Sequence, residues 1–423
     1  MVFEKLLAKR KTDKDGGNAI VGLDIGTEYV KALIAQVDGD NLKIVGVGRV
    51  RQKQSDMHAG AIADISGVVQ NCEKALHQAE EQAGFQAKKV VIGISGELVK
   101  GVTHTIRYRR PQPEKELNEA EMNFIINKVQ ERALIKAQKQ IALETGNENV
   151  EVKLVNSALV SLHIDGYKVS NPIGFQGRDV AVQIYTAYAP MVHIGALERV
   201  ADELALDLVA VAAEPFAVSR AVIGTDASSS FTAILLDIGG GTTDIAVVND
   251  GGVEGTKMFS IGGRSFTRTI SRELNLSPEE AEGIKLSIDS SKLNDNIRDG
   301  AFAAVKKTLD VWLAGVELAL GEFEEIDQMP NQLWLCGGGA SLESLVTALA
   351  EHQWPENLPF SKQPVVKRIL PSDVIDIKDS TDTISDHTFI TAMGLLRVGQ
   401  DTLRIDDSDD LNFKEKLNKI LRI

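Results

Sequence analysis

A short pattern that occurs twice constrains the fold of this chain more than any other feature. Residues 20–27 read IVGLDIGT, and residues 235–244 read LLDIGGGTTD. In each copy an apolar, strand-like run ends near an aspartate. The aspartate is followed by glycines, by hydroxyl side chains and then by a second apolar strand. Such a hairpin directs backbone N–H groups and hydroxyls at an anion and holds a carboxylate beside it. Two copies in successive halves predict two lobes that grip one polyphosphate from opposite sides.

A third element follows the same logic. Residues 333–340 read LWLCGGGA, which is a strand followed by glycines and the start of a helix. Three glycines at that point let the backbone approach a nucleoside closely. An aspartate followed by glycines is usually only a turn, so either hairpin alone is a weak signal. The three elements in this order are much more specific.

The composition excludes several other classes of protein. Of the 423 residues 46 are Lys or Arg and 60 are Asp or Glu, and a net charge of −14 argues against a nucleic-acid-binding body. Cys72 and Cys336 are the two cysteines, so no disulfide framework is expected and both are predicted to be small buried side chains. The histidines lack metal-ligand spacing, and the sequence has neither a nucleophile elbow nor a Walker A loop. No apolar run approaches the ~20 residues of a membrane span, and the N-terminus does not read as a signal peptide.

The glycine-rich elements resemble those of the actin-like ATPase superfamily, which includes actin, the Hsp70 chaperones and the sugar kinases. By this resemblance the two hairpins are phosphate loops and the third element is the adenosine loop. Lys31 sits where the actin loop carries a lysine, and Glu214, followed by a proline, resembles the Hsp70-type segment that links the two lobes. Residues 389–396 resemble the second interlobe helix.

Within that superfamily the chain is similar to the FtsA family of bacterial cell-division proteins, from about residue 22 to residue 397. The resemblance rests on residues 91–96, which lead into the inserted domain of that family, and on the Asn-Pro-hydrophobic-Gly segment at 171–177. Residues 259–263 and 281–285 also fit. The chain departs from the family at Glu28, where a small or polar residue is usual. A carboxylate beside phosphate oxygens is unfavourable, so Glu28 is expected to weaken ATP binding or slow hydrolysis.

The predicted fold class is therefore α/β, with an actin-like ATPase fold of two lobes, a nucleotide cleft, and a small inserted α/β domain in the first lobe. The segment from 96 to 188 is too long for a loop in a compact domain, which is why it is assigned to that insert. We expect this organisation along the chain: a basic tail (1–18), the first lobe (19–95), the inserted domain (96–188), the first lobe continued (189–230), the second lobe (231–384), an interlobe helix (385–399), an acidic linker (400–410) and an amphipathic helix (411–423).

The last thirteen residues form a separate signal. Phe413, Leu417, Ile420 and Leu421 follow a spacing of i, i+4, i+7 and i+8 and would share one face of a helix, with basic residues on its flanks. After an acidic linker, this pattern predicts a helix that lies in the headgroup region of an anionic membrane. The alternative is a terminal helix that docks on the protein itself. FtsA carries a similar tail.

The resemblance also implies roles for individual residues. We expect an ATP site formed by Gly26, Thr27, Lys31, Gly239, Gly240, Gly241, Thr242, Thr243, Glu282, Lys285, Gly337, Gly338 and Gly339. Asp24 and Asp237 would hold Mg²⁺ through water, since Mg²⁺ binds few carboxylates and keeps its hydration. Glu214 or Asp244, with Asp237, would form the catalytic group. Hydrolysis is expected to be slow, because no arginine finger is evident in the sequence.

By the same resemblance, the chain is expected to bind ATP and Mg²⁺, to polymerise, and to tether a ring of the tubulin-like protein FtsZ to the cytoplasmic face of the bacterial plasma membrane at the division site, where later division proteins are recruited. Two alternatives stay open. One is a PilM-like scaffold of pilus or secretion machinery, which has the same fold and a Val-Lys pair like that at 30–31. The other is a small-molecule kinase, for which the sequence lacks a substrate signature.

Overall fold

The computed structural model describes residues 16–224, 229–289, 293–324, 326–351 and 354–407. Residues 1–15 of the predicted N-terminal tail, and the amphipathic segment with Phe413, Leu417, Ile420 and Leu421, lie outside the described residues. In the described part no helix is long and apolar enough to cross a membrane.

A six-stranded sheet forms the centre of the first lobe. Its strand order is β11 (Asp207–Ala213), β6 (Lys89–Ile94), β1 (Ala19–Ile25), β2 (Tyr29–Asp38), β3 (Asn41–Arg51) and β17 (Ile377–Asp379). Helices α2 (Ile65–Ala83) and α4 (Met191–Glu203) pack on one face, where Leu23 contacts the core around Cys72 and Leu197. In the sequence, Val68, Cys72, Leu76 and Ala79 recur at helical spacing and predict a helix from 65 to 82 with Gly84 as its stop. Helix α2 confirms this prediction, and Gly84 at its end has a φ of 76°.

A nine-stranded sheet runs through the second lobe and beyond it. Its order is β16 (Val365–Arg368), β15 (Gln332–Cys336), β12 (Ala233–Ile238), β13 (Thr243–Asn249), β14 (Gly252–Phe259), β7 (Lys100–Arg109), β10 (Asp179–Pro190), β8 (Val152–Ile164) and β9 (Tyr167–Lys168). Helices α6 (Gly263–Leu274), α8 (Asp295–Gly321) and α9 (Glu343–Glu351) cover its outer face around Trp312. Helix α7 (Pro278–Leu286) packs beside α6. Residues 277–280 read SPEE, which predicts a capping box at the start of a helix, and the structure has this box between Ser277 and Glu280.

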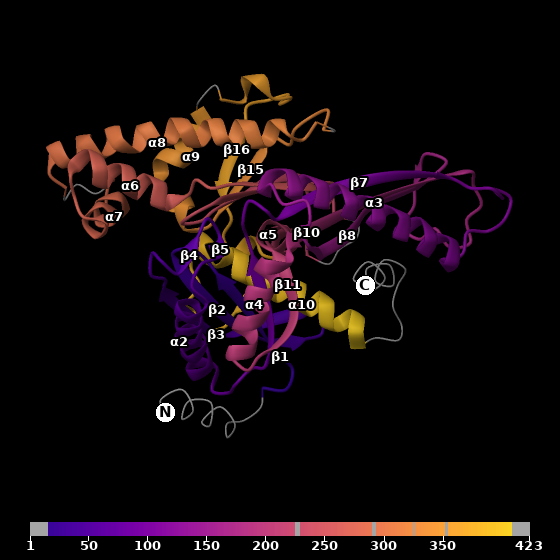
Figure 1. Cartoon of the computed structure of the whole chain (residues 1–423), viewed down its shortest axis with the longest axis horizontal. Helices are drawn as coiled ribbons and strands as arrows, with labels where there is room; N and C mark the ends of the chain where they lie inside the picture. Colours follow the sequence, from indigo (N-terminus) through magenta and orange to yellow (C-terminus); the bar gives the residue numbers. More distant parts are fainter. Residues whose placement is uncertain (1–15, 225–228, 290–292, 325, 352–353, 408–423) are drawn as a thin grey trace.

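Two helices fill the space between the sheets. Helices α5 (Glu214–Ile223) and α10 (Ile390–Asp407) share one core with Ile20 and Leu33 of the first sheet and with Leu235 of the second. Figure 1 shows both helices at the centre of the molecule, between the two lobes. The ends of β1 and β12, which carry the two hairpin motifs, are therefore directed toward the same interlobe region.

The inserted segment has a hydrophobic core of its own. Helix α3 (Glu119–Thr145) packs on β7, β8 and β10 through residues such as Ile125 and Val182. The segment is joined to the second lobe by pairing of β7 with β14, and it also contacts the first lobe, where Ala213 N donates to Asn156 Oδ1 over 2.7 Å. Figure 1 shows it extending away from the centre of the molecule. The limits of 96–188 for this domain stay a prediction.

The acidic linker was predicted to begin too early. Helix α10 does not end at residue 399 but continues through Asp407. Leu403 packs against the interlobe core and Arg404 pairs with Asp40, and these contacts stabilise turns that look polar in sequence. Tertiary packing thus overrides the local composition.

A small hairpin and several short turns complete the described part. The two-residue strands β4 (Met57–His58) and β5 (Ala61–Ile62) form a small hairpin beside the first lobe. Short 3₁₀ turns lie at Gly338–Ser341, Trp354–Asn357, Pro371–Asp373 and His387–Phe389.

Candidate nucleotide site

The first hairpin places an aspartate and a hydroxyl at the end of a buried strand. Asp24 is buried near the end of β1, and the turn to β2 closes with a hydrogen bond from Gly26 N to Tyr29 O of 3.1 Å. Thr27 is buried at the tip of this turn. The predicted geometry of strand, aspartate and glycine turn is present.

The second hairpin repeats this arrangement. Asp237 and Asp244 face each other across the β12–β13 ladder, and the turn closes with a bond from Gly239 N to Thr242 O of 2.9 Å. The start of α6 is held behind the turn, because Gly263 N donates to Gly239 O over 2.9 Å.

The two turns meet in space although more than 200 residues separate them in sequence. A Cβ atom on Gly241 would lie 2.8 Å from Thr27 Oγ1, and one on Gly240 would lie 2.9 Å from the Cβ of Glu28. Because only glycines can come this close to Thr27 and Glu28, the two loops are in contact in this structure. A polyphosphate between them requires the lobes to move apart.

A cluster of buried charges lies behind the loops. Lys31 Nζ pairs with Asp24 Oδ2 at 2.8 Å. Burial lowers the pKa of Lys31, but attraction to Asp24, Asp237 and Glu214 outweighs it and the net shift is upward. Burial raises the pKa of Asp244 to about 7, and repulsion from Asp237 adds to the rise. Burial, then repulsion from Asp24 and Asp244, raises the pKa of Glu214 well above its ordinary value.

This donor set fits a hydrated cation. The buried carboxyl groups of Asp24, Asp237, Glu214 and Asp244 are accompanied by one largely covered lysine, and the raised pKa values of Glu214 and Asp244 show that their ionised forms lack enough positive charge nearby. Among the described residues no three side chains converge closely enough to ligate a metal directly. A hydrated Mg²⁺ needs no such direct triad, and its charge would favour the ionised carboxylates.

The third glycine-rich element lies against the second hairpin. Gly337 has a φ of 79°, and a Cβ there would lie 2.1 Å from Asp237 Oδ1, so the position requires glycine. Gly339 makes a similar close approach to Ile238, whereas Gly338 is exposed with open space beside its Cα. The element therefore presents backbone next to the Asp237 carboxylate.

Glu282 and Lys285 lie behind the second loop. They form an ion pair of 2.8 Å on α7, and Lys285 Nζ also donates to Gly263 O and to Thr267 Oγ1. Their position beside the start of α6 places them near Gly239. Both are near the candidate site, but at present they bind α6.

Thr243 is the one predicted ligand whose hydroxyl is directed elsewhere. Its Oγ1 donates to Ile261 O and accepts from Trp312 Nε1 at 2.8 Å, and the residue is fully buried. The structure thus places this side chain in the core of the second lobe and leaves Thr242 on the loop side, where its Oγ1 donates to Asp244 over 3.0 Å.

Sequence reasoning missed three side chains at this site. Ser95 Oγ donates to the Asp244 carboxylate across the two lobes at 3.0 Å, and Thr391 on α10 donates to Asp237 Oδ2. Arg264, at the start of α6, pairs with Glu28 at 2.7 Å. Each lies within or next to a segment used for the family resemblance, namely 91–96, 389–396 and 259–263. Their position in or next to these segments was the signal that could have identified them as site residues.

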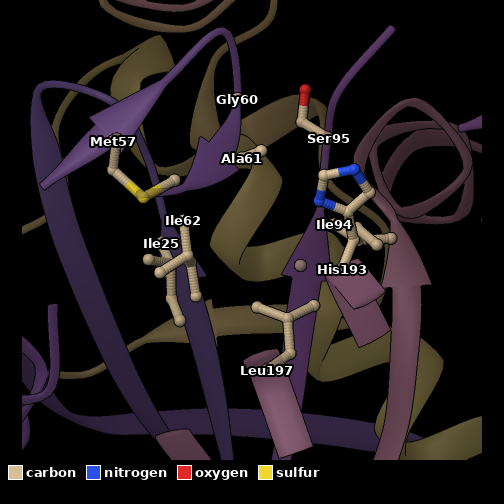
Figure 2. A pocket seen from close by; sticks show the side chains of 10 residues that line it. Ile25, Met57, Gly60, Ala61, Ile62, Ile94, Ser95, His193 and Leu197 are labelled. Carbon is tan, nitrogen blue, oxygen red and sulfur yellow. The ribbon is translucent and has the colours of Figure 1, made fainter. Parts of the chain in front are cut away.

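A small pocket adjoins the first hairpin. Figure 2 shows Ser95 and His193 on one side of it and Met57 and Ile62 on the other. The cavity volume is about 10 Å³, which is near the smallest that holds one water molecule. Because Ser95 also bonds to Asp244, this pocket lies directly beside the buried carboxylates.

Comparison with known proteins shows which family the chain resembles. The family described as cell division protein FtsA matches residues 234–394. Cell division protein FtsA of Bacillus subtilis is 24% identical over 406 residues, covering 91% of this chain and 84% of its own. The protein of the same name from Pseudomonas aeruginosa is 25% identical, covering 90% and 89%. The chain is FtsA-like.

A solved structure supports the actin-like fold of this FtsA-like chain. The PilM–PilN complex of type IV pilus biogenesis aligns with a TM-score of 0.65 at 18% identity, covering 90% of this chain and 98% of the compared chain. At that identity the likeness concerns the fold alone. The predicted fold class, with two lobes and an actin-like ATPase architecture, is confirmed.

Proposed function

We propose that this FtsA-like protein binds Mg²⁺–ATP between its two hairpin loops and couples that binding to assembly at the division site. The observation that carries the proposal is the meeting of the loops: Gly240 and Gly241 approach Glu28 and Thr27 so closely that a side chain on either glycine would clash. Two anion-binding turns from different lobes, facing each other over buried carboxylates, form a site that suits a polyphosphate with its cation.

In this proposal backbone N–H groups of both turns, together with Thr27, Thr242 and Lys31, hold the β- and γ-phosphates. Asp24 and Asp237 orient the water shell of Mg²⁺, which would neutralise charge on the phosphates. Lys31 is already held at 2.8 Å from Asp24, so the lysine is oriented toward the cluster before any ligand binds.

Glu214 or Asp244 would orient the attacking water. Burial and repulsion from neighbouring carboxylates raise the pKa of both groups in the absence of a cation, so each is less available in the ionised form that accepts a proton. A nearby divalent cation lowers the pKa of neighbouring carboxyl groups. We therefore expect hydrolysis to be slow and to depend on Mg²⁺.

At the level of the cell, the names of the relatives support a role in division. The proteins from Bacillus subtilis and Pseudomonas aeruginosa are both cell division proteins, and this chain covers most of their length. We infer that the chain polymerises, that it tethers FtsZ to the cytoplasmic face of the plasma membrane as a peripheral protein, and that its inserted domain contributes to filament contacts and to recruiting later division proteins. The PilM-like alternative has support from the fold only.

Recruitment of FtsZ to vesicles tests this role. Full-length protein, FtsZ from the same cell and anionic vesicles are sedimented together with Mg²⁺ and ATP. We expect FtsZ in the pellet only when the full-length protein is present, and not with a truncation that ends at Asp410. FtsZ that stays in the supernatant while the full-length protein sediments would contradict the proposed partner.

A further inference from the structure

Glu28 lies at the point where the two phosphate-type loops meet. Its Oε1 accepts a hydrogen bond from Arg51 Nε at 2.8 Å, and its Oε2 accepts one from Arg264 Nε at 2.7 Å. Arg51 ends β3 of the first lobe, whereas Arg264 belongs to α6 of the second. One carboxylate thus connects the two lobes directly beside the turns.

Arg264 is fixed to the second loop by its backbone. Its N–H donates to Gly240 O over 2.8 Å, and Gly240 in turn packs against the Cβ of Glu28. The side chains of Glu28 and Arg264 are only 20% and 18% exposed. A charge-assisted pair that is largely removed from water is stronger than a surface pair, and an arginine fork binds phosphate as well as carboxylate.

Glu28 with its two arginine partners forms a bridge between the lobes, and the negative charge of Glu28 favours contact between them. Burial alone would raise the pKa of Glu28, but the hydrogen bonds and charges of Arg264 and Arg51 outweigh it, and its pKa is below the ordinary value. Glu28 is therefore ionised at neutral pH. It is an anion built into the chain at a place where two anion-binding loops converge.

We propose that Glu28 determines nucleotide specificity by occupying Arg264 in place of a terminal phosphate. The inference rests on the proposed function. A nucleoside triphosphate that enters between the loops must take Arg264 from Glu28 and approach a carboxylate, which costs it affinity. A diphosphate, which lacks the terminal group, meets less of this competition. Glu28 thereby keeps the lobes together in the nucleotide-free protein. It also reduces the affinity for ATP relative to the affinity for ADP.

Calorimetry with Mg²⁺–ATP and Mg²⁺–ADP tests the competition. In Glu28→Gln the repulsion disappears and Arg264 is released, so we expect ATP to bind about tenfold more tightly or better, and ADP to change less. In the double variant Glu28→Gln with Arg264→Gln the gain should be lost. ATP affinity in Glu28→Gln that equals or falls below that of the wild type would overturn the proposal, and so would a gain that survives in the double variant.

Asp401→Asn is the matched control. Asp401 pairs with Arg220 at 2.8 Å with side-chain exposures of 22% and 20%, so the substitution removes the same charge from an arginine pair that is similarly covered but lies between α5 and α10. ATP and ADP affinities should be unchanged in this variant. An equal gain in Asp401→Asn would assign the effect to net charge and overturn the role of Glu28.

A distance measurement without nucleotide separates this proposal from the proposed function. Spin labels at Lys74→Cys on α2 and Lys306→Cys on α8 report the separation of the lobes, because these exposed positions lie on different lobes and the native cysteines are buried. Glu28→Gln should lengthen or broaden the distance distribution of the nucleotide-free protein, and Asp401→Asn should not. An unchanged distribution in Glu28→Gln would refute the bridge, whereas absent ATP binding in wild type and variants would refute the proposed function.

Discussion

Lys31 balances a group of carboxylates that belong to both lobes. It is buried, pairs with Asp24, and is also stabilised by Asp237 and Glu214. Replacement by methionine, Lys31→Met, keeps most of the volume but leaves the carboxylates uncompensated. We expect the free energy of unfolding in urea to fall by about 3–5 kcal/mol, as for other buried pairs that lose one partner.

The control for that prediction is a half-exposed pair. Lys367 and Asp373 lie 2.9 Å apart with the lysine side chain 40% exposed. Lys367→Met should change the unfolding free energy by less than about 1 kcal/mol. Similar losses in the two variants would contradict the special role assigned to the buried lysine.

The raised pKa of Asp244 predicts how stability depends on pH. Between the ordinary pKa of an aspartate, near 4, and its folded value of about 7, the native state binds more protons at this site than the unfolded state. The contribution to stability therefore falls as the pH rises through this window. Urea unfolding of metal-free, nucleotide-free protein from pH 5 to pH 8 should show this decline, and Asp244→Asn should flatten it. An identical slope in wild type and variant would contradict the assignment.

At the scale of elements, helices α5 and α10 cross at close range inside the core that both sheets share. A Cβ on Gly394 of α10 would lie 2.1 Å from Ala217 O of α5. Alanine normally stabilises a helix interior relative to glycine by about 1 kcal/mol. Gly394→Ala should instead destabilise the protein by about 1–3 kcal/mol, because the helices must separate.

Gly283 in α7 provides the opposite case. No heavy atom lies within 4 Å of the position of its Cβ. Gly283→Ala should stabilise the protein by up to about 1 kcal/mol in thermal or urea unfolding. If both alanine variants shift stability in the same direction, the close crossing of α5 and α10 is not the constraint that the structure indicates.

Elements with strong local signals were predictable from the sequence. The sequence predicted the hairpin of β1 and β2, the helix that ends at Gly84 and the capping box of α7. What the sequence did not indicate depends on long-range packing. Strand β7 pairs with β14 across more than 140 residues, and α10 continues past residue 399 through contacts with a distant loop.

The same limit applies to the candidate site. The sequence indicated both turns and their aspartates, because each turn is local. It did not indicate that the hydroxyl of Thr243 is directed toward Trp312. Alternation along β13 shows which side chains share a face of the strand, but it does not show which face α8 covers. Arg264 was missed because its relation to Glu28 exists only after the lobes have come together.

At the scale of the whole molecule, attachment to a membrane would rest on the segment beyond the described residues. If residues 413–423 form the predicted helix, several large apolar side chains can bury, each worth ~1.5–3 kcal/mol at most, and each basic residue near an anionic leaflet adds about 1 kcal/mol. A single helix of this kind binds reversibly, and the proposed polymerisation would strengthen the attachment through multivalency. Leu417→Glu with Ile420→Glu should release the protein from anionic vesicles in co-sedimentation while ATP binding is retained.

High salt should weaken this attachment only in part, because the apolar contribution is not screened. A truncation that ends at Asp410 should behave like the double variant. Equal sedimentation of the wild type, the double variant and the truncation would show that another segment is the anchor, and Phe3, Leu6 and Leu7 would then be tested next.

The central claim is that two loops from different lobes hold one nucleotide, and isothermal titration calorimetry with Mg²⁺–ATP tests it most directly. Wild-type protein should bind one ATP per chain. Asp24→Asn and Asp237→Asn each remove one carboxylate, from different loops, and each should weaken binding by about 10- to 100-fold, since groups that orient metal-bound water act on the same ion. Asp401→Asn should bind as the wild type does. No binding to the wild type at millimolar ATP, or loss in one aspartate variant with full affinity in the other, would contradict a site shared by both lobes.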